Sequence, residues 1–240
     1  MANPRFYVPN IPYEEGQPIT LPEEASHHAM HVLRLRNEDR IDLFSGNGLE
    51  ASGLVQFNKT GTSLILDSVT TTPEPKLRII LLQSVISNEK MDWVIEKACE
   101  TGVSKIVVFP SSRGEIKLTG EKIVKRLDRW KKIAVSACMQ CRQNRIPEIL
   151  FVSSLDRAFE HAEGRCFVTA PSLEKTPTGD CPQGCVSFLI GPEGGLTNGE
   201  IQLALDNHFE ARLLGPRVLR TETAGITASV WAQTLWGDLT

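Results

Sequence analysis

Two apolar runs near the carboxyl end of the sequence each stop at a Gly-Pro pair, and this feature limits the possible folds more than any other. Residues 186–190 lead into Gly191. Residues 211–214 lead into Gly215 in the same way. Short apolar runs bounded by turn residues are typical of buried strands in an α/β sheet. Because ligands of open α/β sheets bind at the carboxyl ends of the strands, we expect the two loops to line one site.

The first loop, residues 191–195, combines three glycines with one acid, Glu193. Glycine lets a backbone approach a ligand closely, because it has no Cβ. The loop has no lysine and lacks both the Walker spacing and the G-x-G-x-x-G pattern, so a neutral or cationic ligand suits it better than a phosphate. Thr197 and Glu200 form a capping box, which predicts that a helix starts there. The alternative is a tight strand-to-helix turn without a ligand.

The second loop, residues 215–223, is richer in polar groups. Arg217 and Arg220 offer planar cationic groups that suit a phosphate or a base edge. Glu222 and Thr223 supply an acceptor and a hydroxyl. A capped turn is again the alternative, but two such loops so close together favour a binding site.

These loops carry a resemblance to a known family. Ile-Gly-Pro-Glu-Gly-Gly-Leu-Thr at 190–197, followed by Leu-Gly-Pro-Arg-Val-Leu-Arg-Thr-Glu-Thr-Ala at 214–224, resembles the paired signature of the ribosomal RNA small-subunit methyltransferase E family. That family belongs to the SPOUT superfamily of knotted methyltransferases that use S-adenosylmethionine. The resemblance covers nearly the whole chain. It implies methylation of N3 of a uridine in 16S ribosomal RNA, with S-adenosylmethionine as cofactor and no metal.

The resemblance also implies residue roles in the two loops. The expected cofactor-binding residues are Gly191, Pro192, Glu193, Gly194, Gly195, Leu214, Gly215, Val218, Leu219 and Thr223. The adenine is expected against Val218 and Leu219. Uracil N3 carries a weakly acidic proton, so catalysis needs a group that accepts it or stabilises the anion. Arg220 is the candidate for stabilising charge on the uracil oxygens, and Glu222 either accepts the proton or orients Arg220.

The amino-terminal region, residues 1–72, reads as a small β-barrel domain. Short strand-like runs alternate with turns that contain Asn-Gly and Thr-Gly. A helix is expected over residues 22–33, with Pro22 near its first turn. Residues 26–34 resemble the PUA-like, RNA-binding domain of the same family. Residues 71–76 are polar and rich in proline, so we expect an extended linker there.

The remainder, residues 73–240, alternates strands and helices, which predicts an α/β fold with a mainly parallel sheet flanked by helices. About five strands are expected, at 77–84, 104–110, 165–170, 186–190 and 211–214. Helices are expected at 89–102, 121–142 and 221–236, besides the one that starts at Thr197. Apolar and small residues on the last helix predict a homodimer surface. The resemblance adds a trefoil knot in the carboxyl-terminal part of this SPOUT domain.

A formal net charge of -3 gives the chain no general attraction to nucleic acid, so RNA contacts must come from local groups. The residues expected to contact 16S ribosomal RNA or the 30S subunit are Arg5, His28, Arg34, Lys90, Arg113, Gln140 and Arg142. Residues 139–143 read Met-Gln-Cys-Arg-Gln and so depart from the family's Glu-Gln-(Ser or Cys)-Gly-Arg. A solvated helix face is the alternative for the cluster at 26–36. A basic stripe on one expected helix consists of Lys122, Lys125, Arg129 and Lys132. These cations are further candidates to contact RNA, and a solvated helix face is again the alternative.

The amino terminus lacks the apolar segment of a signal peptide, and no apolar run suffices to span a membrane. We therefore expect a cytoplasmic protein with its six cysteines reduced. Two metal sites are alternatives. One would use Cys138 and Cys141 with Cys181 and Cys185, but the first pair lies on an expected helix with no histidine nearby. The other would use His27 and His31, for which no third ligand is evident.

Two other functions are compatible with the same sequence. One is an RNA-binding or ribosome-assembly protein that does not transfer methyl groups, for which the divergent segment 139–143 is the argument. The other is a related knotted methyltransferase that acts on transfer RNA. Binding of S-adenosylmethionine separates the first alternative from an enzyme, and mass spectrometry of the cellular RNAs separates the second.

Overall fold

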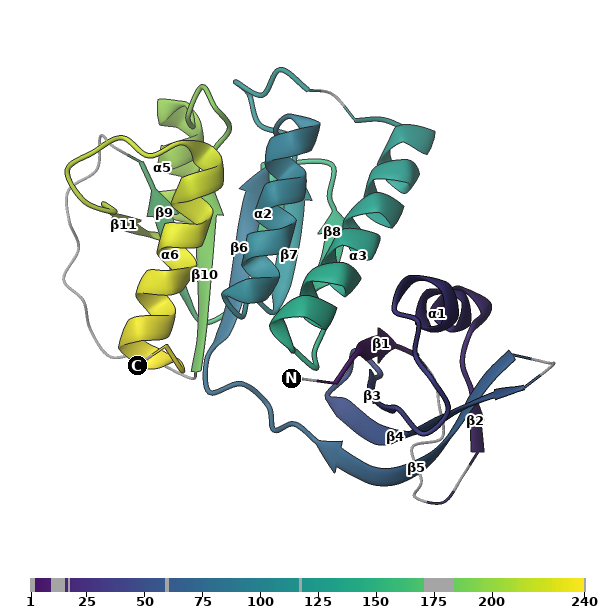
Figure 1. Ribbon diagram of the computed structural model, residues 1–240. Helices are drawn as coiled ribbons and strands as arrows, with labels where there is room; N and C mark the ends of the chain where they lie inside the picture. Colours follow the sequence, from purple (N-terminus) through teal and green to yellow (C-terminus); the bar gives the residue numbers. More distant parts are fainter. Residues whose placement is uncertain are drawn as a thin grey trace. The chain divides into compact units, whose positions relative to one another are not determined.

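The structure is a computed structural model that describes residues 3–9, 16, 18–58, 61–116, 118–170 and 184–239 (Figure 1). Its internal contacts divide the chain into two units. The amino-terminal unit comprises Met1–Glu74 together with Cys138–Ile146. The carboxyl-terminal unit comprises Pro75–Ala137 and Pro147–Thr240. The segment 138–146, which the sequence places in the second domain, therefore packs with the first unit.

The amino-terminal unit is built on a five-stranded sheet with the order β1-β3-β4-β5-β2. Its strands are β1 (Arg5–Tyr7), β2 (Pro18–Thr20), β3 (Arg40–Phe44), β4 (Leu49–Asn58) and β5 (Gly61–Thr71). The expected strands are all present, and β2 is an addition. The pair β1 and β3 is parallel, whereas the other pairs are antiparallel. Alternate side chains of β3, β4 and β5, such as Leu43, Val55 and Leu64, fill the core.

The helix expected over residues 22–33 is an α-helix that continues as a π-helical turn. The α-helix α1 spans Glu23–His27, and the π-helical turn η1 spans His28–Val32. Pro22 stands at the N-cap, where its missing N–H costs no hydrogen bond. Ala29 is fully buried and anchors the turn to the sheet. Short π-helical segments are uncommon and occur frequently at functional sites.

The carboxyl-terminal unit contains a six-stranded parallel sheet with the order β11-β9-β10-β6-β7-β8. Its strands are β6 (Arg78–Ser84), β7 (Lys105–Phe109), β8 (Glu148–Phe151), β9 (Arg165–Thr169), β10 (Cys185–Ile190) and β11 (Glu210–Arg212). The parallel α/β sheet is as predicted, except that it has one strand more. Strand β8 escaped prediction because its four residues are too few to show a period.

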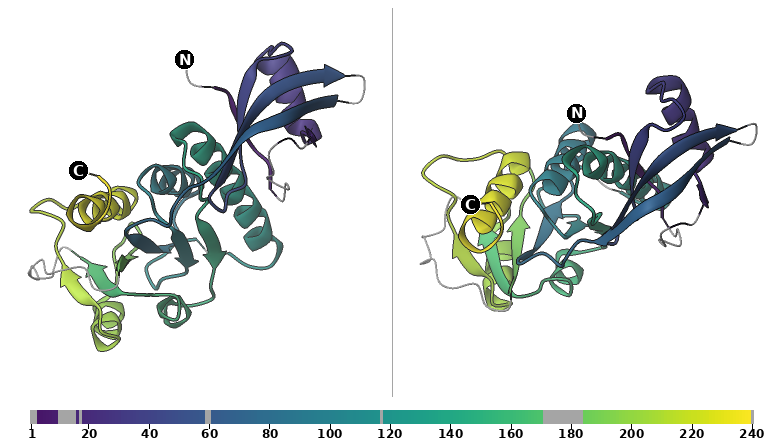
Figure 2. Two further views of the ribbon diagram at one scale, coloured as in Figure 1. Left: turned by 90° about the horizontal axis from the view of Figure 1, so that it is seen from below. Right: turned by 60° about the horizontal axis from the view of Figure 1, so that its bottom comes forward.

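Helices cover both faces of this sheet (Figures 1 and 2). The helices are α2 (Asn88–Glu100), α3 (Glu121–Cys141), α4 (Leu155–Phe159), α5 (Asn198–Asp206) and α6 (Thr221–Trp236). Helices α2, α3 and α6 lie on one face, and α4 and α5 lie on the other. Side chains of α4 and α5, among them Leu155 and Ile201, share an apolar core with Ile80 and Leu189 of the sheet. Only α4 was not predicted.

The expected linker, residues 71–76, is held at two points. Strand β5 runs through Thr71. Beyond it, the carbonyl of Thr72 accepts a hydrogen bond of 2.9 Å from Arg145 Nη2. Glu74 forms a 2.9 Å ion pair with Arg145 Nη1. The first half of the expected linker is therefore bonded to Arg145 of the amino-terminal unit.

Candidate functional site

A pocket of about 660 Å³ lies where three neighbouring strands of the carboxyl-terminal unit end. The last residues of β9, β10 and β11, namely Thr169, Ile190 and Arg212, all line it. Residues from both Gly-Pro loops complete its wall. The two loops therefore line one pocket.

Most residues expected to bind the cofactor face this pocket. Those that line it are Gly191, Pro192, Glu193, Gly194, Gly195, Leu214, Val218 and Leu219. Gly215 and Thr223 are not among the lining residues. Gly215 has a φ of +97°, which side chains disfavour, so the backbone turn itself accounts for the glycine.

Several lining residues were not expected, and one group of them ends or directly follows a strand. They include Thr169, Ala170, Ile190, Arg212 and Leu213. The signal that could have found them is the rule used for the glycine loops, applied to every strand of the sheet. Burial lowers the pKa of Arg212, and the nearby Arg165 lowers it further. Its guanidinium lies 4.5 Å from the ring centroid of Trp231, where a cation–π contact stabilises the charge.

The packing of the first loop itself accounts for its glycines. A Cβ on Gly191 would lie 2.9 Å from the backbone nitrogen of Leu196, which is closer than packed atoms allow. Gly195 adopts a φ of +70°, which side chains disfavour. A Cβ on Gly194 would lie 3.2 Å from Cβ of Arg113. The loop thus packs on itself and on Arg113.

A buried hydrogen-bond chain joins the two loops. Gln83 Nε2, at the end of β6, donates to Thr221 Oγ1 over 3.0 Å. Thr221 Oγ1 in turn donates to the carbonyl of Gly191 over 2.5 Å. Gln83 is fully buried in an otherwise apolar strand. The chain holds the first turn of α6 against the first glycine loop, and a lone glutamine inside an apolar run was its only sequence signal.

The first turn of α6 presents the two expected catalytic residues. Arg220 is the N-cap residue of α6, and its side chain is exposed. Glu222 is half-buried and lines the pocket with Arg220. Within the described residues, Oε2 of Glu222 is buried and has no hydrogen-bond partner. Among the ion pairs of that same part of the chain, none joins Glu222 to Arg220. A ligand N–H group would satisfy this carboxylate oxygen.

Lys90 and Arg113, both expected to face RNA, lie in the wall of the same pocket. Lys90 Nζ is 3.0 Å from Glu193 Oε1. Burial acts to raise the pKa of Glu193, but hydrogen bonds from backbone amides and Lys90 hold that pKa below its usual value. Arg113 Nη1 donates to the carbonyls of Gly194 and Leu196 over 3.2 and 3.4 Å.

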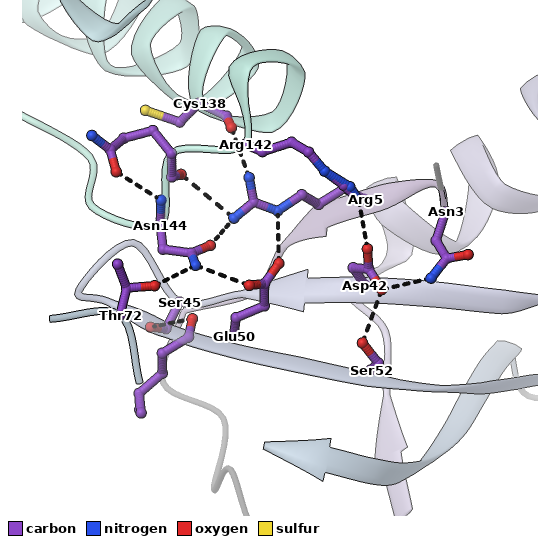
Figure 3. A network of polar contacts seen from close by, with 12 residues as sticks. Asn3, Arg5, Asp42, Ser45, Glu50, Ser52, Thr72, Cys138, Arg142 and Asn144 are labelled. Atoms are coloured by element: carbon purple, nitrogen blue, oxygen red, sulfur yellow. Dashed lines mark hydrogen bonds and ion pairs between the residues drawn. The ribbon is translucent and has the colours of Figure 1, made fainter. Parts of the chain in front are cut away.

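Arg5 does not lie on an RNA-contacting edge, and the expectation for it is corrected. Its side chain is buried and donates to the carbonyl of Cys138 over 2.9 Å and to the side chain of Asn144 (Figure 3). Its guanidinium also lies 4.2 Å from the ring centroid of Phe44. A β-strand residue beside an apolar core can bury a cation when carbonyls and a carboxylate, here Glu50, surround it. Arg5 therefore fixes the segment 138–146 to the amino-terminal unit.

Arg142 and Gln140 are both expected to contact RNA, but the side chain of Arg142 is already ion-paired. Arg142 adopts a φ of +63° and forms a 2.7 Å ion pair with the buried Asp42. Gln140, in the last turn of α3, is exposed. Sequence reasoning could not anticipate the pair, because its two residues are 100 positions apart.

Two more candidates lie at the π-helical turn. His28 is half-buried, with its ring 5.8 Å from that of Phe6 in an edge-to-face contact. Arg34 is exposed and has a φ of +53°, at the point where the helical segment ends. The rings of His27 and His31 are 4.6 Å apart. Over the ranges that the structure describes, no group of three His, Cys, Asp or Glu side chains could hold a metal ion, but Cys181 lies outside those ranges.

No helix in the described part of the chain is both long and apolar enough to cross a membrane.

Comparison with known families identifies two regions. Residues 72–233 match the model of an RNA methyltransferase domain. Residues 21–59 match the model of an RNA methyltransferase PUA domain. The first match covers more than half of the chain and includes every residue of the pocket wall.

Similar proteins cover the chain almost end to end. The ribosomal RNA small subunit methyltransferase E of Buchnera aphidicola subsp. Schizaphis graminum is 33% identical over 98% of both chains. The same-named protein of Neisseria gonorrhoeae, solved bound to S-adenosyl methionine, has a TM-score of 0.90 and 34% identity over 100% of both chains. A putative methyltransferase of Legionella pneumophila, solved with bound cofactor SAM, has the same TM-score, identity and coverage.

Proposed function

The chain belongs to the ribosomal RNA small-subunit methyltransferase E family, and from this premise we propose that it transfers a methyl group from S-adenosylmethionine to N3 of a uridine in 16S ribosomal RNA. The observation that carries the proposal is the shared pocket. One wall is made by the two glycine loops, and Arg220 and Glu222 lie in it with Lys90 and Arg113.

The residues of the pocket suit S-adenosylmethionine, which is a cation with an apolar purine. Val218 is 77% exposed, although it is apolar, and with Leu219 it offers a surface for the adenine. Glu193 and Glu222 are the acids of the wall; Glu193 is paired with Lys90, whereas the unpartnered Oε2 of Glu222 favours a positive sulfur nearby. Of the ten residues expected to bind the cofactor, the eight that line the pocket are proposed to hold it.

When bound, S-adenosylmethionine supplies an electrophilic methyl group on a positively charged sulfur. The chain's task is then to hold uracil N3 in line with that methyl group and to remove the N3 proton. The unpartnered Oε2 of Glu222 is proposed to accept the proton. Arg220 is proposed to stabilise the negative charge that forms on the uracil oxygens, since its guanidinium donates in a planar fork. Because Glu222 Oε2 has no partner among the described residues, Arg220 included, separate roles are favoured over mutual orientation.

RNA is proposed to contact both units. In the carboxyl-terminal unit, Lys90 and Arg113 supply cations beside the methyl-transfer site. In the amino-terminal unit, the exposed Arg34 and Gln140, with His28 and Arg142, are the candidates. We propose residues 1–72 as the RNA-binding PUA-like domain and 73–240 as the methyltransferase domain, with 16S ribosomal RNA or the 30S subunit as partner.

We also propose that the carboxyl-terminal part of the chain is knotted. Helix α6 follows β11 at one edge of the sheet, yet it packs on β10 and β6 and on α2. The hydrogen bond from Thr221 to Gly191 seats its first turn behind the first glycine loop. Tracing the backbone of a crystal structure tests the proposal, and an unknotted trace would withdraw it.

A homodimer and a cytoplasmic location complete the proposal. Trp93 of α2 and Val230 and Leu235 of α6 are exposed apolar side chains on two helices that pack together. Such a patch suits an isologous dimer contact. Light scattering of the eluting protein tests the dimer, and a monomer at all accessible concentrations would contradict it.

Two measurements test the proposed reaction. Calorimetric titration with S-adenosylmethionine should show binding, and an RNA-binding protein without transferase activity would show none. Mass spectrometry of 16S ribosomal RNA from a strain that lacks the gene should show one uridine without its N3 methyl group. A change confined to transfer RNA would instead identify the related knotted transfer RNA methyltransferases.

A further inference from the structure

Glu200 bonds to more of the chain than a capping box requires. In α5, Glu200 Oε2 accepts a hydrogen bond of 2.7 Å from the amide of Thr197, and Thr197 Oγ1 accepts one of 3.1 Å from the amide of Glu200. These two bonds are the predicted capping box. The same side chain then reaches out of the helix. Its Oε1 accepts a hydrogen bond of 2.7 Å from the amide of Ser112, which is 88 residues away.

Ser112 belongs to the loop after β7, and that loop carries Arg113. Ser111 Oγ lies 2.6 Å from Ser84 Oγ, which fixes the start of the loop to β6. The amide of Ser112 is held by Glu200, and the next residue, Arg113, donates to the carbonyls of Gly194 and Leu196. Leu196 directly precedes Thr197, to which Glu200 is already bonded. The two loops and the helix start therefore form a closed ring of hydrogen bonds.

Glu200 remains an ionised carboxylate within this ring of hydrogen bonds. The residue is only 9% exposed, and a buried carboxylate needs several donors to remain ionised. Burial acts to raise the pKa of Glu200, but the hydrogen bonds from Ser112 and Thr197 bring that pKa below its usual value. An ionised carboxylate accepts on both oxygens at once, which a neutral side chain of the same size cannot do.

We propose that Glu200 is a positioning residue that sets Arg113 against the first glycine loop and into the pocket wall, where it meets RNA. Both hydrogen bonds of Arg113 to the loop use Nη1, whereas the guanidinium also carries N–H groups on Nε and Nη2. Those groups are the donors for a phosphate or a base of the substrate. The inference rests on the RNA role proposed above for Arg113, and the experiment separates the two.

Glu200→Gln is the direct test, because it keeps the volume and removes one acceptor. The NH2 group of the glutamine would face the amide of either Ser112 or Thr197, and the hydrogen bond to that amide would be lost. We expect the KM for RNA to rise about tenfold, with the Kd for S-adenosylmethionine changed less than about threefold. Arg113→Ala should raise the KM to a similar degree. The double variant should be no worse than either single variant, since both remove the same contact. Gln202→Ala is the matched control, because Gln202 lies on the same helix and its exposed side chain donates to Asp206.

Multiplied effects in the double variant, or a loss of cofactor affinity as large as the rise in KM, would overturn the proposal. A crystal structure of Glu200→Gln gives the independent readout, and Arg113 still bonded to Gly194 would also overturn it. If Arg113 is displaced while the KM for RNA stays constant, the positioning role stands and the RNA role of Arg113 fails. Glu200→Asp, which retains the charge but is shorter by one methylene, replaces the glutamine variant if the latter does not fold.

Discussion

Lys90 and Glu193 form an ion pair of 3.0 Å between Nζ and Oε1, although 103 residues separate them in the sequence. The pair joins the first turn of α2 to the first glycine loop, within the wall of the pocket. Both side chains are partly exposed, so the pair contributes little to stability, of the order of 1 kcal/mol or less. Its importance lies in placing a cation in the wall of the pocket that we propose for methyl transfer.

Lys90→Ala should weaken RNA binding more than it weakens binding of S-adenosylmethionine. A lost phosphate contact lowers affinity across sequences and reduces the slope of log K against log salt by about 0.7 for a single strand. Filter binding at several salt concentrations measures this slope, and Lys76→Ala, at an exposed lysine outside the pocket, is the control. An unchanged slope would show that Lys90 pairs with Glu193 but does not contact an RNA phosphate.

Arg220→Ala should reduce kcat by about 100-fold or more, because it removes a donor that stabilises charge formed during the reaction. The Kd for S-adenosylmethionine should stay within a few-fold of the parent value. Single-turnover methylation and calorimetry measure the two quantities. Parallel loss of both would mean that Arg220 builds the pocket, and its catalytic role would then have no support.

Arg5→Met should destabilise the protein by about 1–3 kcal/mol, since it leaves buried acceptors without a donor. The carbonyl of Cys138 and the side chains of Asn144 and Glu50 lose a donor or charge partner (Figure 3). Urea denaturation measures the change, with Arg40→Met, whose ion pair with Asp67 is exposed, as the control. A loss no larger than that of the control would show that Arg5 is not structural, and would return it to the RNA-binding candidates.

Asp42 should make stability dependent on acidic pH. Burial acts to raise the pKa of Asp42, but hydrogen bonds from Asn3, Ser52 and Arg142 hold that pKa below its ordinary value. A depressed native pKa adds stability above the unfolded value, near 4, and that stability is lost as the pH falls through the native value. Asp42→Asn should therefore flatten the fall in the free energy of unfolding below about pH 4. Parallel curves for the two proteins in this range would contradict the assignment.

The spacing of apolar and capping residues predicted the helices whose backbone hydrogen bonds lie within the helix itself. Helix α6 spans Thr221–Trp236, the range expected from its first polar turn and apolar spacing. The capping box of Thr197 and Glu200 is present with both bonds. Strand β8 was missed because four residues carry no period, and β2 was missed because three residues carry even less.

The candidate site could be predicted only where a general rule applies. The rule that ligands bind at the carboxyl ends of parallel strands brought the two glycine loops together correctly. The same rule, applied to β9, would have added Thr169. No rule of spacing predicts Gln83, whose bond to Thr221 crosses 138 positions of the sequence.

By itself, the sequence determined the parallel α/β unit, the glycine loops and the start of α5, because hydrogen bonds within a helix and apolar periodicity depend on neighbours in the chain. Only the tertiary structure decided that Arg5 is buried, that Glu200 also binds Ser112 and that Arg142 meets Asp42. The physical reason is that burial and ion pairing depend on which distant residues surround a side chain. Two arginines of the same sequence character thus serve different purposes: Arg5 closes a buried network, and Arg113 faces the pocket.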